Sequence, residues 1–193
     1  MSPRAGLDLP TVLKAAADLA DEQGLEQVTL GELAKRLNVR TPSLYNHIEG
    51  LPALRQRLSI HGLAQLLERM TAAAVGRSGD EAIVAMSEAY LAFARAHPGL
   101  YEATFRAPRT DDPELVRAQD AVVELVLRVL RPYGLGDAAT LHTIRGLRSI
   151  LHGFASIERS GGFGMPLDTD ESFRLLLGTF LAGVHAAAKQ DQL

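Results

Sequence analysis

The chain has 193 residues, 47% of them apolar and 22% charged, with a formal net charge of −3 and no cysteine. Such a chain can bury a substantial core, and its composition is that of a globular protein. The lack of cysteine excludes disulfides, thiolate zinc sites and a cysteine nucleophile. Because neither a run of about 18 apolar residues nor a signal peptide is evident, we expect a cytoplasmic protein with no membrane partner.

The negative net charge argues against a protein that coats nucleic acid with its whole surface, because such binding is driven by basic charge. It remains compatible with a small DNA-reading segment. Residues 33–48 contain no acidic side chain but include Lys35, Arg36 and Arg40. This window is therefore the first candidate for a DNA contact.

Apolar residues recur at spacings of three and four along the chain, and no convincing strand pattern occurs, so the predicted fold class is all-α. The first helix is predicted from Pro10 to about Gln23, where Gly24 ends it. The second starts at a capping box, in which the Thr29 hydroxyl and the Glu32 carboxylate each accept from the other residue's backbone amide.

The second helix is predicted to end near Leu37, because Asn38 tolerates the left-handed backbone that stops a helix. Thr41 as N-cap and Pro42 as the first helical residue then predict a third, short helix to about His47. Six further helices are predicted. One spans about 51–75, the next starts after a break at 77–80 and runs to about 96, and the others span about 100–106, 114–130, 137–159 and 169–189. We predict two domains: a three-helix head at 1–50 and a helical body at 51–193.

Two short helices joined by a tight turn, the second of them polar, are typical of the helix-turn-helix motif. The second helix must expose small or hydrogen-bonding side chains to read the major groove. On this basis the candidate DNA contacts are Lys35, Arg40, Thr41, Pro42, Ser43, Tyr45, Asn46 and His47. The alternative is that Tyr45 packs on its own helix and the others are merely solvated.

Residues 24–54 resemble the N-terminal motif of the TetR family of transcriptional regulators. The residues that carry this resemblance are Gly24, Thr29, the pair Leu33-Ala34, and the string Leu44-Tyr45-Asn46-His47-Ile48. The chain departs from the family pattern at the turn glycine, at the Phe that follows the His, and at the Lys that contacts phosphate; it carries Asn38, Ile48 and Leu51 there. Arg55 or Arg57 is the candidate to replace that Lys.

Further along, residues 96–101 and 151–158 resemble a TetR subgroup with a Trp-His-Gly signature, here Leu151-His152-Gly153. The resemblance implies a homodimer that pairs its last two long helices and binds a near-palindromic operator on double-stranded DNA. The apolar residues expected on the dimer faces are Ile144, Leu147, Ile150 and Leu151 in one helix, and Leu175, Leu176, Phe180 and Val184 in the other.

The body is also expected to bind a small hydrophobic or amphipathic effector that releases a repressor from DNA. The candidate lining residues are Met86, Tyr90, Phe93, Phe105, Leu127 and His152. Met and aromatic residues at helical spacing are more often plain core, and the alternative favoured for His152 is a buried structural histidine.

The sequence gives no sign of catalysis, so we expect no enzyme activity, no cofactor and no metal. The six histidines lack paired ligand spacing, and neither a phosphate loop nor a nucleophile motif is present. A helical enzyme or small-molecule-binding protein without DNA activity remains the alternative. The acid-free window at 33–48 argues against that alternative. The sequence does not distinguish a repressor from an activator.

Overall fold

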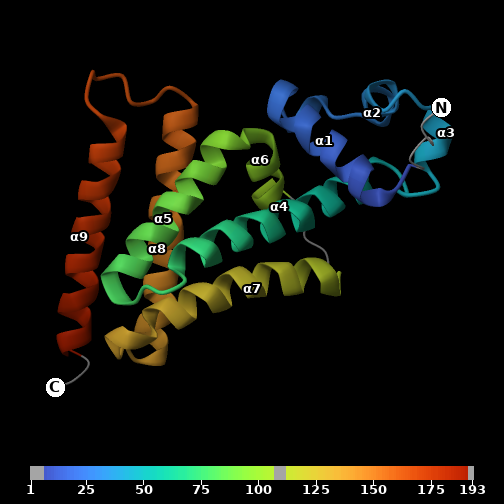
Figure 1. The fold of residues 1–193 in the computed structure, drawn as a ribbon. Helices are drawn as coiled ribbons and strands as arrows, with labels where there is room; N and C mark the ends of the chain where they lie inside the picture. Colours follow the sequence, from blue (N-terminus) through green and yellow to red (C-terminus); the bar gives the residue numbers. More distant parts are fainter. Residues whose placement is uncertain (1–6, 107–111, 191–193) are drawn as a thin grey trace. The chain divides into compact units, whose positions relative to one another are not determined.

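The structure is a computed structural model that describes residues 7–106 and 112–190. Within these ranges every regular element is a helix, which confirms the all-α prediction (Figure 1). The α-helices are α1 (Leu9–Gln23), α2 (Leu30–Arg36), α3 (Thr41–Leu44), α4 (Leu51–Ala74), α5 (Gly79–Ala96), α6 (Pro98–Arg106), α7 (Pro113–Leu130), α8 (Asp137–Arg159) and α9 (Thr169–Gln190). Two short 3-10 helices, η1 (Leu25–Gln27) and η2 (Arg131–Tyr133), were not predicted.

The expected boundaries hold to within one residue except at the starts of α5 and α6 and at the end of the third helix. Helix α1 begins at Leu9 because the Asp8 carboxylate accepts from the Thr11 amide at 2.9 Å and caps it. Helix α6 begins at Pro98, which was predicted to lie in the break between this helix and the preceding one. The third helix is a single α-helical turn that ends at Leu44, followed by turns rather than by helix to His47.

Contacts divide the chain into two compact units, Met1–Gln65 with Ala96–Ala118 and Leu66–Arg95 with Gln119–Leu193. The first unit holds the three N-terminal helices together with α6. The boundary predicted at residue 50 separates two roles rather than two compact units, so it stays a prediction.

The core of the first unit forms where α1 meets α6. Val12, Ala16 and Ala20 lie on the buried face of α1. Gly99 brings the first turn of α6 against the backbone of α1, where a side chain would collide with the Ala20 carbonyl group. Burial of apolar surface drives this packing, and the glycine permits its closeness.

In the second unit, α5, α8 and α9 contribute several of the large buried side chains. Phe93 is buried on α5, and the Phe154 ring on α8 contacts the Phe173 ring on α9, with centroids 4.9 Å apart. Arg95 at the end of α5 forms ion pairs with Glu158 of α8 and Asp170 of α9. Among the residues described here, no helix is long and apolar enough to cross a membrane.

Candidate nucleic-acid interface

The α2 helix begins and ends as the sequence indicated. The Thr29 hydroxyl accepts from the Glu32 amide at 3.2 Å, which confirms the predicted N-cap. At the other end, Asn38 has φ 52°, and the amides of Asn38 and Val39 donate to the carbonyl oxygens of Lys35 and Ala34. This is the Schellman arrangement, and it turns the chain sharply toward α3.

The start of α3 corrects one prediction. Thr41 is the first helical residue rather than the N-cap; the N-cap position is occupied by Arg40, and no side chain caps the helix. The Arg40 carbonyl still accepts from the Ser43 amide at 2.8 Å. The proline at the second position needs no hydrogen-bond acceptor, which explains why this short helix forms without a side-chain cap.

The buried and exposed sides of α3 are sharply separated. Leu44 is fully buried and Ile48 nearly so, and these two hold the segment against the head. Tyr45 is 58% exposed, although its size would favour burial. An exposed aromatic ring at the end of a short polar helix is suited to contacts with DNA phosphates or thymine methyl groups.

The eight predicted DNA contacts all lie at α2, the turn or the α3 segment. Lys35, Arg40, Pro42, Tyr45 and Asn46 are exposed, whereas Thr41, Ser43 and His47 are half-buried. Lys35 lies 3.9 Å from Glu32, a loose pair on a solvated surface that a phosphate can displace. The residues therefore share one accessible segment, and their role as DNA contacts stays a prediction.

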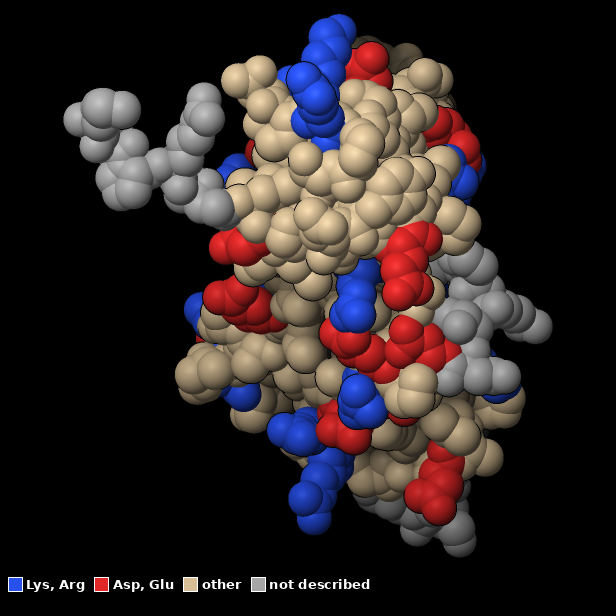
Figure 2. Space-filling view, turned by 90° about the vertical axis from the view of Figure 1, so that its right-hand side faces the viewer, with Lys and Arg blue, Asp and Glu red and all other residues tan. Residues whose placement is uncertain are grey.

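The two arginines proposed to replace the missing phosphate-contacting Lys are engaged within the protein. Arg55 donates to Glu26 at 3.2 Å and Arg57 donates to Glu114 at 2.5 Å. Neither cation is available to a phosphate without the loss of an ion pair. Figure 2 shows acidic and basic side chains intermixed on the face that it presents, rather than one continuous basic surface.

This geometry, a capped helix, a left-handed turn and a short helix with an exposed polar side, defines a helix-turn-helix DNA-binding regulator. Comparisons with known proteins identify the family of this regulator. A family model described as bacterial regulatory proteins of the tetR family matches residues 12–47, and one described as the tetracyclin repressor-like C-terminal domain matches residues 83–180.

Two curated relatives are similar over nearly the whole chain. The uncharacterized HTH-type transcriptional regulator YobS of Bacillus subtilis is 40% identical over 95% of this chain and 96% of its own length. The uncharacterized HTH-type transcriptional regulator Rv0681 of Mycobacterium tuberculosis is 32% identical over 93% of this chain and 83% of its own. The chain belongs to the TetR family.

Solved structures show the same fold at low identity. A protein of unknown function from Rhodococcus sp. RHA1 covers 95% of this chain and 98% of its own, at 21% identity and a TM-score of 0.80. A TetR protein from Acinetobacter baumannii in complex with minocycline covers 95% and 99%, at 21% identity and a TM-score of 0.72.

The candidate effector residues are distributed over both units. Met86 and Phe93 are fully buried on α5, Tyr90 and His152 are half-buried, and Leu127 is partly exposed on α7. Phe105 belongs to the other unit, where its ring meets that of Tyr101 edge-on with centroids 5.3 Å apart. The effector site therefore stays a prediction.

His152 lies in a region that opposes its charged form. Burial and the nearby guanidinium groups of Arg148 and Arg159 lower the pKa of His152. A neutral imidazole can both donate and accept a hydrogen bond. It is therefore suited to a neutral polar partner rather than to an ion pair.

An open cavity of about 380 Å³ does occur in the second unit, away from those candidates. Its lining residues are Gly79, Asp80, Pro132, Tyr133, His185, Ala188 and Lys189. The Tyr133 hydroxyl donates to the Asp80 carboxylate at 2.5 Å, and the His185 imidazole lies 2.9 Å from it. These two contacts lower the pKa of Asp80. Among the described residues, no group of three or more metal-ligating side chains is found.

The exposed surface of α9 differs in part from the predicted dimer face. Of the predicted residues Leu175, Leu176, Phe180 and Val184, Val184 is buried within its own unit and only Leu175 is strongly exposed, at 67%. The other exposed residues of this stretch are Gly178, Thr179, Ala182 and Gly183. The signal that was available is the absence of any charged residue from 175 to 184.

Proposed function

We propose that this regulator is a homodimeric repressor of near-palindromic DNA, released by a small apolar or amphipathic effector bound in its helical body. The observation that carries the DNA-reading role is the exposed Tyr45 on a segment fixed by buried Leu44. The proposed contacts are the eight predicted residues from Lys35 to His47. A cytoplasmic location and the absence of catalysis belong to the same proposal.

Dimerisation is supported by the exposed, uncharged surface of α9. A solvated helix surface normally carries charge, whereas the exposed residues between Arg174 and His185 carry none. Small residues such as Gly178 and Ala182 would let a second copy approach closely. A two-fold dimer would then place two reading segments about one DNA turn, roughly 34 Å, apart.

Thr179→Glu is expected to break the dimer. Across a two-fold axis the same residue recurs on the partner, so the change buries two like charges near each other. Such a juxtaposition costs several kcal/mol, equivalent to about a hundredfold or more in dimer affinity. Light scattering across a dilution series would measure it. Gln119→Glu on the exposed surface of α7 is the matched control, and equal effects of both changes would contradict the α9 interface.

Effector release is supported by family membership and by solved neighbours of the same fold, one of them in complex with minocycline. The effector would bind more tightly to the body conformation in which the two heads are wrongly spaced for the operator. Its binding would therefore lower the fraction of protein bound to DNA. A coupling of about 1–3 kcal/mol, or 5- to 150-fold in operator affinity, is typical.

The experiment that tests the DNA-reading role compares wild type with Tyr45→Ala on duplexes selected by the wild-type protein from a random library. Loss of a phosphate or base contact is expected to weaken binding by about 1–3 kcal/mol, or 5- to 150-fold. Binding should also fall steeply with salt. Fluorescence anisotropy at several salt concentrations would measure both effects.

Gln27→Ala is the matched control, since Gln27 is exposed in the head but outside the proposed contact segment. It should bind as wild type does. A folded dimer that selects no duplex at any salt concentration would overturn the proposal. The protein would then be a ligand-binding protein or enzyme built on a regulator fold.

A further inference from the structure

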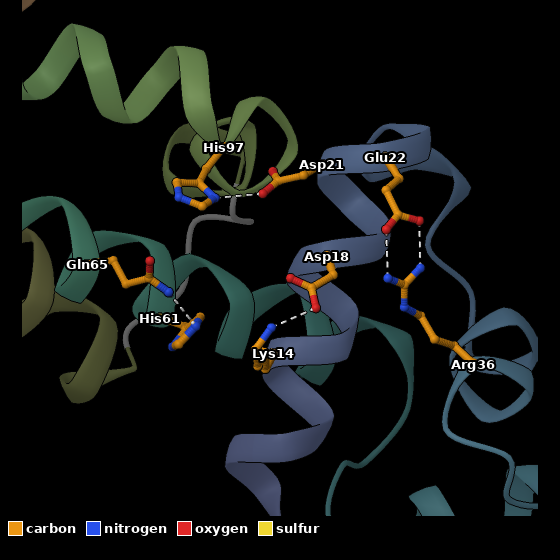
Figure 3. A network of polar contacts seen from close by, with 8 residues as sticks. All are labelled: Lys14, Asp18, Asp21, Glu22, Arg36, His61, Gln65 and His97. Carbon is orange, nitrogen blue, oxygen red and sulfur yellow. Dashed lines mark hydrogen bonds and ion pairs between the residues drawn. The ribbon is translucent and has the colours of Figure 1, made fainter.

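The last turn of α1 carries two acidic residues, Asp21 and Glu22. A helix C-terminus has partial negative charge and favours cations, yet this turn contains no basic residue. A local preference that is broken in this way indicates that contacts with other elements compensate for it. Figure 3 shows the two carboxylates directed to different partners, one to His97 and the other to Arg36.

Asp21 attaches the end of α1 to α6. Its Oδ1 atom accepts from the amides of Gly99 and Leu100 at 2.9 and 2.8 Å. Its Oδ2 atom lies 2.9 Å from Nδ1 of His97. The first amides of a helix have no acceptor within that helix, and Pro98 has no amide hydrogen at all. Asp21 therefore caps α6 from outside and fixes the last turn of α1 within the first unit.

Glu22 attaches the same turn to the last residue of α2. The Nη1 and Nη2 atoms of Arg36 donate to the two carboxylate oxygens of Glu22 at 2.6 and 2.7 Å, which makes a bidentate pair. The hydrogen bonds from Arg36 lower the pKa of Glu22 and so favour the charged carboxylate. A planar guanidinium meets a carboxylate in this way in one relative orientation, so the pair constrains direction as well as distance.

Arg36 lies just before the turn that leads to α3. The turn at Asn38 follows two residues later, and α3 begins at Thr41. The buried apolar residues of α2 are Leu33 and Ala34, in the middle of this seven-residue helix. The Glu22–Arg36 pair therefore adds a directional restraint at the end of α2 from which the chain continues into the proposed contact segment.

The pair also neutralises one cation of the acid-free window at 33–48. Both Nη atoms of Arg36 are bonded to a carboxylate that lies outside the window, 14 residues earlier in the chain. A DNA phosphate could recruit this guanidinium only by displacing an acceptor that is itself an anion. Arg36 is therefore poorly suited to the phosphate contact that its charge and its place in the window would suggest.

We propose that Glu22 and Arg36 are positioning residues of DNA recognition, whose bidentate pair holds the end of α2 on α1 and thereby orients the proposed contact segment toward DNA. The inference rests on the proposed DNA-binding function. It gives an acidic residue of the head a favourable role in the binding of a polyanion, which is the opposite of what its charge alone predicts.

The sign of the effect at Glu22 tests the proposal. By charge alone, loss of an acidic side chain should strengthen binding to every duplex. Glu22→Gln is instead expected to weaken binding to the duplex selected by the wild-type protein by about 5- to 25-fold, because such a pair contributes up to about fivefold and two heads bind each operator. Binding to a duplex of scrambled sequence should not weaken. Fluorescence anisotropy at one salt concentration would measure both affinities.

Two further variants separate geometry from charge. Arg36→Lys keeps the charge but offers no planar fork, so it should lower the affinity for the selected duplex alone. The double variant Glu22→Arg with Arg36→Glu restores the pair with its ends exchanged. The bonded atoms lie within 2.7 Å of each other, so the exchange leaves the charge at this place nearly unchanged. Affinity for the selected duplex should therefore return toward the wild-type value.

Glu49→Gln is the matched control, since Glu49 is exposed just beyond the proposed contact segment. Loss of this charge should change the affinities for the selected and the scrambled duplex by the same factor. The ratio of the two affinities should therefore stay at the wild-type value in Glu49→Gln and fall in Glu22→Gln.

Other outcomes would overturn the proposal. If Glu22→Gln binds the selected duplex as tightly as the wild type or more tightly, Glu22 acts through its charge alone. If it binds both duplexes more weakly by one factor, the pair supports only the stability of the head. If the double variant binds no better than Glu22→Arg, the pair does not orient α2. In these three cases the DNA-binding proposal stands. If a folded dimer selects no duplex, both proposals fail.

Discussion

Gly99→Ala is expected to destabilise the protein more than Gly→Ala changes at the other described glycines of the first unit. The added Cβ atom would lie 2.6 Å from the Asp21 backbone nitrogen and closer still to the Ala20 carbonyl group. Both obstacles are backbone atoms within a helix, so no side chain can rotate away. Overpacking typically costs about 1–3 kcal/mol, and we expect about 3 kcal/mol or more here, because α1 and α6 must move apart.

Urea unfolding at a fixed protein concentration would measure this loss, since the stability of the proposed dimer depends on concentration. Gly31→Ala in α2 is the matched control. Its Cβ would meet only the Thr29 hydroxyl, at an ordinary 3.8 Å. Because alanine favours helix, that variant should match the wild type or gain up to about 1 kcal/mol. Similar stabilities of the two variants would show that α1 and α6 are not closely packed.

Leu44→Ala is expected to weaken operator binding strongly, although its side chain is fully buried. Leu44 is the buried residue of a four-residue helix that has no side-chain cap. Truncation of a buried Leu costs about 2–5 kcal/mol, and here that cost falls on the segment proposed to read DNA. The free energy of unfolding and the operator affinity should therefore fall together.

The neighbouring variant Tyr45→Ala separates packing from contact. Because Tyr45 is exposed, its loss should reduce affinity while leaving the free energy of unfolding within about 0.5 kcal/mol of wild type. Leu44→Ala should reduce both quantities. The structural role of Leu44 would be contradicted if that variant retained wild-type unfolding and wild-type affinity.

Much of the head could be read from the sequence, because its signals are local. The Thr29 hydroxyl bonds an amide three residues away, and Asn38 adopts its left-handed backbone without help from distant residues. Local rules were less reliable at α3. Thr41 looks like an N-cap, but the helix begins at Thr41 itself and Arg40 occupies the N-cap position.

The sequence by itself determined the helical class, the capped turn at Asn38 and the exposed, acid-free segment around Tyr45. It did not disclose that Arg55 and Arg57 are paired with Glu26 and Glu114, because these partners lie 29 and 57 residues away.

Tertiary structure alone decided the role of Asp21, which caps a helix 78 residues further along, and the closeness of Gly99 to α1. Caps and turns depend on neighbours in the chain, so their residue types carry the signal. Contacts between distant elements depend on how helices pack, and a lone Asp or Gly in the sequence carries no mark of the partner that it will meet.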